Sequence, residues 1–186
     1  EEESSRLNEI DVIQPALFAI QVALAEFWRY WGVTPDAVVG HSMGEVAAAH
    51  SSGALNLEDA ARVICRRSQL MKKTSGQGTM ALVEISYEEA LRTITAYEGR
   101  LSVAAVNGPT STVLSGAPAA MQEVLDALEG RGVFCPPVKV DVASHSPQME
   151  PLCGELEQAL RDLHPLPAAI PVCSTVTAEF ECGTLF

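Results

Sequence analysis

Basic residues are scarce in this chain of 186 residues. Lys and Arg together number 12 against 24 Asp and Glu, which gives a formal net charge of −12. A protein that binds nucleic acid or an anionic membrane surface needs an excess of basic charge on its contact face. The sequence therefore predicts neither a nucleic-acid partner nor a membrane partner.

Long apolar runs and targeting signals are also missing. We find no apolar stretch that reaches the roughly 20 residues needed to span a bilayer. The first residues, EEESSRLNEID, lack the basic and apolar regions of a signal peptide. The chain begins without Met, so we expect a further segment upstream of it.

Paired cysteines are absent, since no Cys-x-x-Cys occurs. The cysteines are odd in number and widely spaced, which is typical of free thiols in a reducing compartment and does not suit a zinc site. We expect a cytoplasmic chain without a metal or a bound cofactor. The five are Cys65, Cys135, Cys153, Cys173 and Cys182.

The remaining composition is that of a globular domain, with 47% hydrophobic and 19% charged residues. Apolar spacing and turn residues predict an alternation of helices and strands. Helices are expected over 14–31, 46–51, 57–73, 87–97, 117–129 and 149–163. Strands are expected over 37–40, 79–85, 101–106, 112–114, 134–142 and 170–175, and the last residues, AEFECGTLF, over no regular element.

The middle of the chain carries a recognisable element order. Between 79 and 142 the predicted elements run β-α-β-β-α-β, the order of a ferredoxin-like unit. We therefore predict an α/β fold in which a small ferredoxin-like subdomain, 76–139, is inserted into a large subdomain made of 1–75 and 140–186.

The segment GHSMGE at 40–45 is the most informative part of the sequence. It matches G-x-S-x-G between a predicted strand and a predicted helix, the context of a nucleophile elbow. The sharp turn exposes Ser42, while Gly40 and Gly44 let strand and helix pass closely. The amide of Met43, at the helix N-terminus, is placed to stabilise an oxyanion.

Two other interpretations of this segment stay open. It could be a glycine-rich turn capped by a serine, because short matches of this kind arise by chance. A phosphate-binding loop is disfavoured, because no lysine follows the glycines.

A serine nucleophile needs a base, and four histidines are candidates. His145 lies where a strand ends and turns into a helix, a place where sites gather in α/β folds. The side chain of His41 should point to the opposite face from Ser42, although it remains a candidate substrate contact. We expect His50 and His164 to have no catalytic role.

Arg67 lies on the apolar side of its predicted helix, in line with Ala60, Ile64 and Met71. An arginine turned toward a core needs an anionic partner. Two interpretations stay open. The guanidinium either forms an internal salt bridge or extends to water, or it binds the carboxylate of a substrate, which its planar shape suits.

These segments together resemble the acyltransferase domains of modular polyketide synthases and related type I fatty acid synthases. The resemblance covers roughly residues 10–178 and is carried by four segments. They are GHSMGEVAAAHSSGALNLEDAARVICRRSQLMK at 40–72, NGPTSTVLSG at 107–116, KVDVASHSPQM at 139–149 and PVCSTVTAE at 171–179.

The resemblance implies an α/β-hydrolase-like large subdomain and a ping-pong reaction. Ser42 would take an acyl group from a malonyl-type coenzyme A thioester, with His145 as base and Arg67 holding the free carboxylate. The phosphopantetheine arm of an acyl carrier protein would then accept it, and a ketosynthase would be a neighbouring domain. A backbone carbonyl orients the imidazole in this family, so no acidic third member is expected.

The residues before His145 bear on the extender unit. In this family HAFH accompanies malonyl and YASH accompanies methylmalonyl. Here Ser144 leaves room for an α-methyl branch, which favours methylmalonyl, whereas Val142 matches neither type and Met43 is indecisive.

The resemblance also implies missing parts at both ends. We expect no counterpart of the amino-terminal strand with its second oxyanion glutamine, nor of the carboxyl-terminal segment whose carbonyl orients the imidazole. A serine esterase or thioesterase, and a non-catalytic fragment of a synthase, therefore remain alternatives to an acyltransferase.

Overall fold

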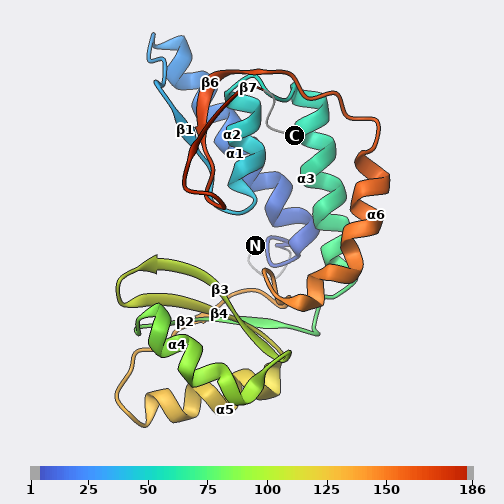
Figure 1. Cartoon of the computed structure of the whole chain (residues 1–186). Coiled ribbons are helices and arrows are strands. Elements are labelled where there is room, and N and C mark those ends of the chain that lie inside the picture. The colour runs from blue at the N-terminus through green and yellow to red at the C-terminus, as the bar shows by residue number, and fades with distance from the viewer. Residues whose placement is uncertain (1–4, 184–186) are drawn as a thin grey trace. The chain divides into compact units, whose positions relative to one another are not determined.

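The computed structural model describes residues 5–183 and divides the chain into two compact units. The first unit comprises Glu1–Gln69 and Leu156–Phe186, and the second comprises Leu70–Glu155. The chain thus leaves the first unit once and returns to it (Figure 1). The predicted subdomain boundaries at 75/76 and 139/140 fall within the second unit and stay predictions.

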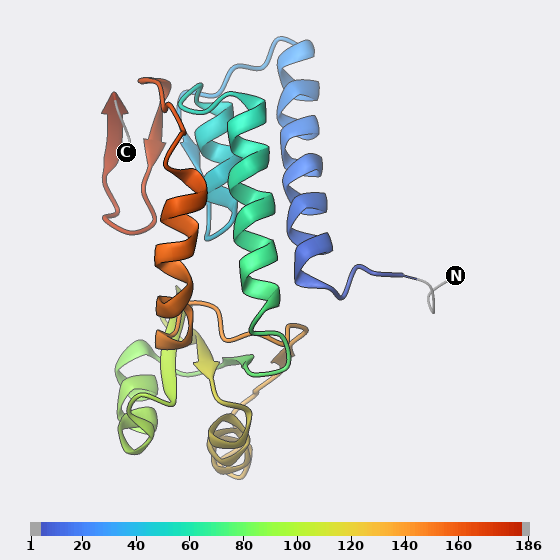
Figure 2. The ribbon, with the colours of Figure 1, turned by 90° about the vertical axis from the view of Figure 1, so that its right-hand side faces the viewer.

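The first unit contains α1 (Ile10–Tyr30), α2 (Gly44–Ser51), most of α3 (Leu57–Lys72) and the end of α6 (Glu150–Leu160). The last three residues of α3 belong to the second unit. Figure 2 shows α1, α2 and α3 side by side. Gly32, with φ +80°, follows the end of α1, and Asn56 caps α3 by accepting the amide of Asp59 at 2.8 Å. Both ends agree with the sequence.

The core of this unit lies where α1, α2 and α3 meet. α1 contributes large apolar side chains, and α2 contributes alanines that allow the helices to pack closely. α3 adds the apolar side chains of its buried face. The buried members include Phe18, Val22, Ala47, Ala49, Ala60 and Ile64.

Helix α1 corrects the expectation about apolar length. Its 21 residues are long and apolar enough to cross a membrane by length and composition alone. Only 22% of this apolar window is buried, including Phe18 and Val22, which pack in the core with α2 and α3. The prediction of no such stretch was wrong because Gln14, Gln21 and Glu26 interrupt the run without ending the helix.

The sheet of the first unit has the order β1-β6-β7, formed by Val38–Val39, Ala168–Cys173 and Phe180–Gly183. β1 and β6 are parallel, with Val38 opposite Val172, although most of the chain separates them. The prediction of an irregular end was wrong for β7, which pairs antiparallel with β6. Its residues carry no strong strand pattern, so its conformation depends on the partner strand.

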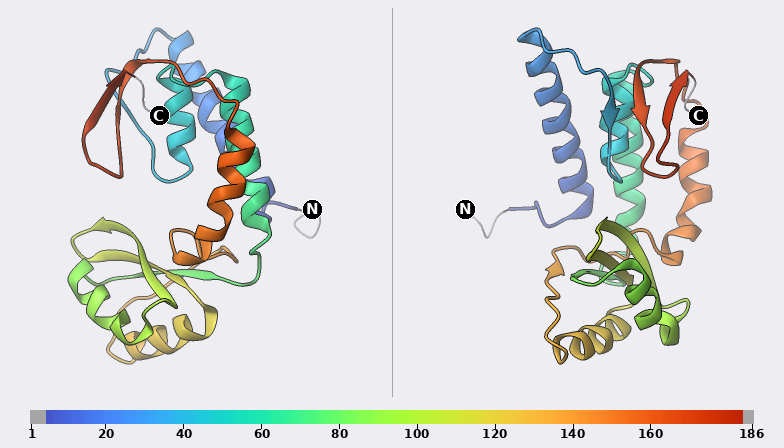
Figure 3. Two further views of the ribbon diagram at one scale, coloured as in Figure 1. Left: turned by 45° about the vertical axis from the view of Figure 1, so that its right-hand side comes forward. Right: turned by 60° about the vertical axis from the view of Figure 1, so that its left-hand side comes forward.

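The second unit contains a four-stranded antiparallel sheet in the order β3-β4-β2-β5. Helices α4 and α5 lie on the same face of it (Figures 1 and 3). Along the chain the elements are β2 (Thr79–Val83), α4 (Tyr87–Ile94), η2 (Thr95–Tyr97), β3 (Leu101–Gly108), β4 (Ser111–Gly116), α5 (Pro118–Glu129) and β5 (Pro137–Val138).

A separate core fills the space between this sheet and its helices. Alternate residues of β2 and β4 point inward, so that Ala81 and Leu114, which are paired across the strands, are both buried. α4 contributes Ala90 and Ile94 to this core, and α5 contributes Val124 and Leu128.

The predicted strand over 134–142 is assigned as a strand only at Pro137–Val138, which pairs with β2. The amides of Leu82 and Glu84 also donate to the carbonyls of Pro136 and Phe134, at 3.1 Å each, so the contact with β2 extends back to Phe134. Pro136 and Pro137 have no amide proton to donate to a neighbouring strand, which limits the pairing. The chain then forms a loop, the short helix η3 (Pro147–Met149) and α6 (Glu150–Leu160).

Candidate active site

Ser42 stands at a strained turn between β1 and α2. Its φ is +53°, in the left-handed region that side chains other than glycine rarely adopt. The turn is closed by the amide of Gly44, which donates to the carbonyl of His41 at 2.9 Å, and by that of Glu45, which donates to Ser42 at 3.0 Å. This is the strained strand-to-helix geometry that the G-x-S-x-G pattern predicts.

The two glycines of the motif have different roles. A Cβ on Gly40 would lie 2.3 Å from the backbone carbon and oxygen of Gly44, a separation that real Cβ atoms do not reach. A Cβ on Gly44 would meet only the Nε2 of Gln21, at 3.9 Å. The expectation of a close approach is therefore confirmed at Gly40, and it is wrong for a side chain at Gly44.

The amide of Met43 lies at the start of α2, and its role as an oxyanion donor stays a prediction. Met43 precedes the first turn of α2, whose dipole places partial positive charge there. The amides of Gly44, Glu45 and Val46 all donate to carbonyls of the turn. Within residues 5–183, no hydrogen bond from the Met43 amide to a backbone carbonyl is found outside the helices and strands.

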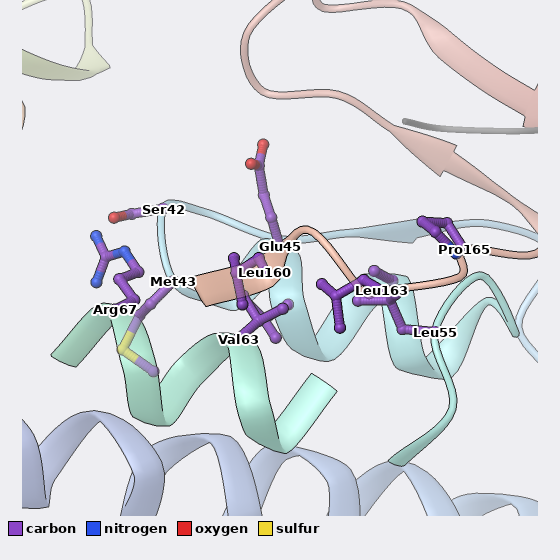
Figure 4. Close-up of a pocket in the computed structure, with 11 residues that line it drawn as sticks. Ser42, Met43, Glu45, Leu55, Val63, Arg67, Leu160, Leu163 and Pro165 are labelled. Atoms are coloured by element: carbon purple, nitrogen blue, oxygen red, sulfur yellow. The ribbon is translucent and has the colours of Figure 1, made fainter. Parts of the chain in front are cut away.

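A pocket of about 340 Å³ opens beside Ser42, entirely within the first unit. Figure 4 shows Ser42 and Arg67 at one end of the pocket, with the guanidinium turned toward the serine. Mostly apolar side chains of α2, α3 and the end of α6 form the rest. The lining residues are Ser42, Met43, Glu45, Val46, Ala49, Leu55, Val63, Arg67, Leu160, Leu163 and Pro165.

Arg67 is held in the pocket by a neutral partner. Its Nη1 donates to the Oε1 of Gln14 at 2.6 Å, and Gln14 is a buried residue of α1. Burial lowers the pKa of the Arg67 guanidinium, because a charge is costly away from water. Among the described residues no carboxylate forms an ion pair with it, so the structure does not supply the internal salt bridge considered above.

The one carboxylate of the pocket is engaged elsewhere. Glu45 accepts a hydrogen bond from the hydroxyl of Thr175 at 2.7 Å, and the same hydroxyl lies 3.3 Å from the carbonyl of Gly40. In Figure 4 the carboxylate points away from Arg67. Thr175 thus ties the segment after β6 to the elbow.

His145 lies in the second unit, in the loop between β5 and η3. It is exposed and has a φ of +59°, so its backbone is strained like that of Ser42. The hydroxyl of Ser146 donates to the carbonyl of Ala143 at 2.7 Å and accepts the amide of Gln148 at 3.3 Å, which braces the turn around the imidazole. The pairing of His145 with Ser42 stays a prediction.

The other predicted substrate contacts have different settings. His41 lines a separate hollow of about 460 Å³ together with Gln21 and Ser51, and it is not among the residues that line the Ser42 pocket. Val142 is wholly buried, with 0% exposure, so any influence on a substrate would act through packing. Ser144 is half-buried.

The other histidines and the described cysteines do not line the Ser42 pocket. His50, in α2, is half-buried, and its Nδ1 lies 3.0 Å from the carbonyl oxygen of Leu55. His164 follows α6 in a loop. In the described part of the chain, no group of three or more His, Cys, Asp or Glu side chains could hold a metal ion. Cys65, Cys135, Cys153 and Cys173 are free thiols, and the side chain of Cys182 lies outside the description.

Sequence reasoning missed Gln14 and Thr175. A signal for Gln14 was present, because it falls at i+4 between Ile10 and Phe18 on the buried stripe of α1. A polar residue on such a stripe needs a hydrogen-bonding partner. Thr175 gave no comparable signal.

Comparison with known proteins points to one family. The Acyl transferase domain family matches residues 1–183. The chain is 47% identical over 178 residues to the erythronolide synthase EryA2 of Saccharopolyspora erythraea, which covers 96% of this chain and 5% of that protein.

Solved structures agree. The acyltransferase domain from module 8 of the salinomycin polyketide synthase superposes with a TM-score of 0.93 at 46% identity, over 96% of this chain and 42% of that one. A loading acyltransferase from the avermectin modular polyketide synthase gives 0.91 at 42% identity, over 95% and 57%. The chain thus spans about half the length of these solved domains. It belongs to the acyltransferase domains of modular polyketide synthases.

Proposed function

We propose that this domain transfers a malonyl-type extender unit from coenzyme A to an acyl carrier protein, through an ester on Ser42. The observation that carries the proposal is the guanidinium of Arg67, which shares the pocket with Ser42 and has only the neutral amide of Gln14 as a described partner. The free carboxylate of a malonyl group supplies the anion. Simple acyl groups are disfavoured, because they leave a buried charge unpaired.

In the first half-reaction the Ser42 hydroxyl attacks the thioester carbonyl and His145 takes its proton. Negative charge develops on the carbonyl oxygen, where the Met43 amide donates to it. The carbon–sulfur bond then breaks, the proton passes from His145 to the leaving thiolate, and coenzyme A departs as the thiol. The acyl group remains on Ser42 as an ester.

In the second half-reaction the thiol of the carrier protein's phosphopantetheine arm attacks this ester. His145 accepts the thiol proton and returns it to Ser42 as the ester bond breaks. The pair acts as a Ser–His dyad, with a backbone carbonyl orienting the imidazole, and no bound cofactor takes part. A carrier protein and a ketosynthase are the expected partners.

The extender unit we favour is methylmalonyl. Ser144, beside His145, is smaller than a phenylalanine and leaves room for an α-methyl group. One methyl group changes selectivity by only about 1–3 kcal/mol. Ser144 alone therefore does not fix the choice between malonyl and methylmalonyl, and Val142, which matches neither type, adds no preference.

The second unit fits a ferredoxin-like small subdomain inserted into an α/β-hydrolase-like large one. Its element order of β-α-β-β-α-β supports this assignment. The strand order β3-β4-β2-β5, with both helices on one face, is consistent with it.

The direct test is to incubate the chain with methylmalonyl-coenzyme A and measure the mass added at Ser42. We expect one acyl group per chain, and none on Ser42→Ala. Arg67→Ala should lower the acylation rate by about 100-fold, since a charge-assisted contact to the carboxylate is lost. Arg67→Lys should recover only part of it, because an ammonium cannot form the bidentate contact.

The same variant separates the alternatives. An esterase or thioesterase does not need a substrate carboxylate. Arg67→Ala would then leave the hydrolysis of simple esters and of acetyl-coenzyme A unchanged, and it would not slow the reaction with malonyl-type thioesters selectively. A folded chain that forms no adduct on Ser42 with any thioester would be a non-catalytic fragment.

A further inference from the structure

We propose that Gly78 is a positioning residue for His145: the missing side chain at 78 lets the loop that carries the imidazole lie directly against the start of β2. This inference rests on the proposed function, in which His145 is the base. It assigns a role to a glycine that lies far from the histidine in the sequence.

The contact between the two segments leaves no room for a side chain. A Cβ on Gly78 would lie 2.2 Å from the backbone nitrogen of Ala143, 2.6 Å from its Cβ and 2.8 Å from its Cα. Both Gly78 and Ala143 are buried. Because the obstructing atoms belong largely to the backbone, no rotation relieves the clash, and Ala143 would have to move by roughly 1 Å to regain van der Waals contact.

A displacement of Ala143 is passed on to His145 by the turn between them. The carbonyl of Ala143 accepts the hydroxyl of Ser146, so hydrogen bonding closes the chain on both sides of the imidazole. The backbone of His145 is in the left-handed region, where a residue with a side chain has few other allowed conformations close by. The turn therefore moves as one piece with Ala143.

The loop is also anchored just before this contact. The amide of Gly76 donates to the carbonyl of Asp141 at 2.8 Å, and the hydroxyl of Ser75 donates to the carboxylate of Asp141. Segments 75–78 and 141–143 are thus tied at one end and in backbone contact at the other. Sliding the loop along β2 to make room would break the anchor.

The test is Gly78→Ala, with Gly154→Ala as the matched control. Gly154 lies in α6 of the same unit, and a Cβ there meets nothing within 4 Å. The acylation of Ser42 by methylmalonyl-coenzyme A is measured in single turnover. Gly78→Ala should slow the saturated rate by about 100-fold, the cost of a 1 Å misplacement, with the half-saturating concentration unchanged. Gly154→Ala should match the parent chain.

A second comparison asks whether Gly78 acts through the imidazole. In the His145→Ala background, Gly78→Ala should cause no further loss, because the group that it positions is gone. The same fold-loss in both backgrounds would overturn the positioning role. A His145→Ala variant as fast as the parent would instead overturn the proposed function.

A readout independent of activity completes the design. Imidazole carbon–proton resonances, with His145 assigned from the spectrum of His145→Ala, should shift for His145 in Gly78→Ala and stay in place for His50. Unmoved His145 resonances contradict the inference. If Gly78→Ala does not fold, Ser75→Ala removes only an exposed hydroxyl from the anchor, and it should shift the same resonances by a smaller amount.

Discussion

The absence of a side chain at Gly40 decides whether the turn at Ser42 can form. Gly40 faces the backbone of Gly44, and nothing in that contact can rotate away. Strain is already present at Ser42, whose φ is +53°. A site that exposes a nucleophile on such a turn depends on the packing around it to keep the strained conformation.

We therefore expect Gly40→Ala to destabilise the chain by about 3 kcal/mol, the upper part of the range for overpacking. The free energy of unfolding in urea measures the effect. Gly44→Ala is the matched control, since its Cβ would meet only Gln21 at 3.9 Å, and it should change stability by less than about 0.5 kcal/mol. Equal losses in the two variants would contradict the asymmetry between the glycines.

The environment of Arg67 is another property of single side chains. A carboxylate in place of Gln14 would neutralise the guanidinium and fill the role that we assign to the substrate. The neutral amide orients the guanidinium but leaves its charge available. Burial lowers the pKa of Arg67 and also strengthens the attraction between its guanidinium and an anion, because charges interact more strongly away from water. In the proposed function, this attraction favours substrates with a free carboxylate over those without one.

Within individual helices, local capping explains where the chain turns. Ser86 precedes α4 and accepts the amide of Glu89 at 3.3 Å, which satisfies one of the free donors of the first turn. α4 covers the sheet of the second unit through Ala90 and Ile94, so its N-terminus bears on the core.

Ser86→Ala should lower the free energy of unfolding by about 1 kcal/mol, the usual cost of a lost N-cap. Ser86→Asp retains an acceptor and adds a favourable charge at the helix N-terminus, so it should recover most of that loss. Thermal unfolding followed by circular dichroism measures both. No difference between the two variants would show that the cap contributes nothing.

At the scale of the whole chain, the hydrophobic core is divided into two separate clusters. Leu114 is fully buried among α4, α5 and their sheet, and none of its cluster belongs to the core around Phe18 and Ile64. The structure thus contains two hydrophobic clusters, each within one compact unit of the chain.

Leu114→Ala should destabilise the second unit by about 2–5 kcal/mol through the cavity that it leaves. Hydrogen exchange should accelerate in β2, β3 and β4 and stay close to the parent values in α2. Val106→Ala, at an exposed position of β3, is the control and should change little. Uniform acceleration over both units would mean that the chain unfolds as one cooperative body.

The sequence by itself determined the elements with strong local signals. Helical spacing, Asn56 as a cap and the glycine after α1 located the helices within a few residues, because these features depend on neighbours in the chain. The elbow at Ser42 was equally predictable, since the strained turn, its clearance glycine and its helix start occupy six consecutive residues.

Only the tertiary structure decided the contacts between distant segments. Gln14 meets Arg67 across 53 residues, β7 is a strand because β6 lies beside it, and Gly78 is pressed against Ala143. The strand that apolar content predicted over 134–142 ends at Val138, where the chain turns and stops pairing with β2. Such contacts depend on which surfaces pack together, and backbone preferences, which act over a few neighbouring residues, do not encode them.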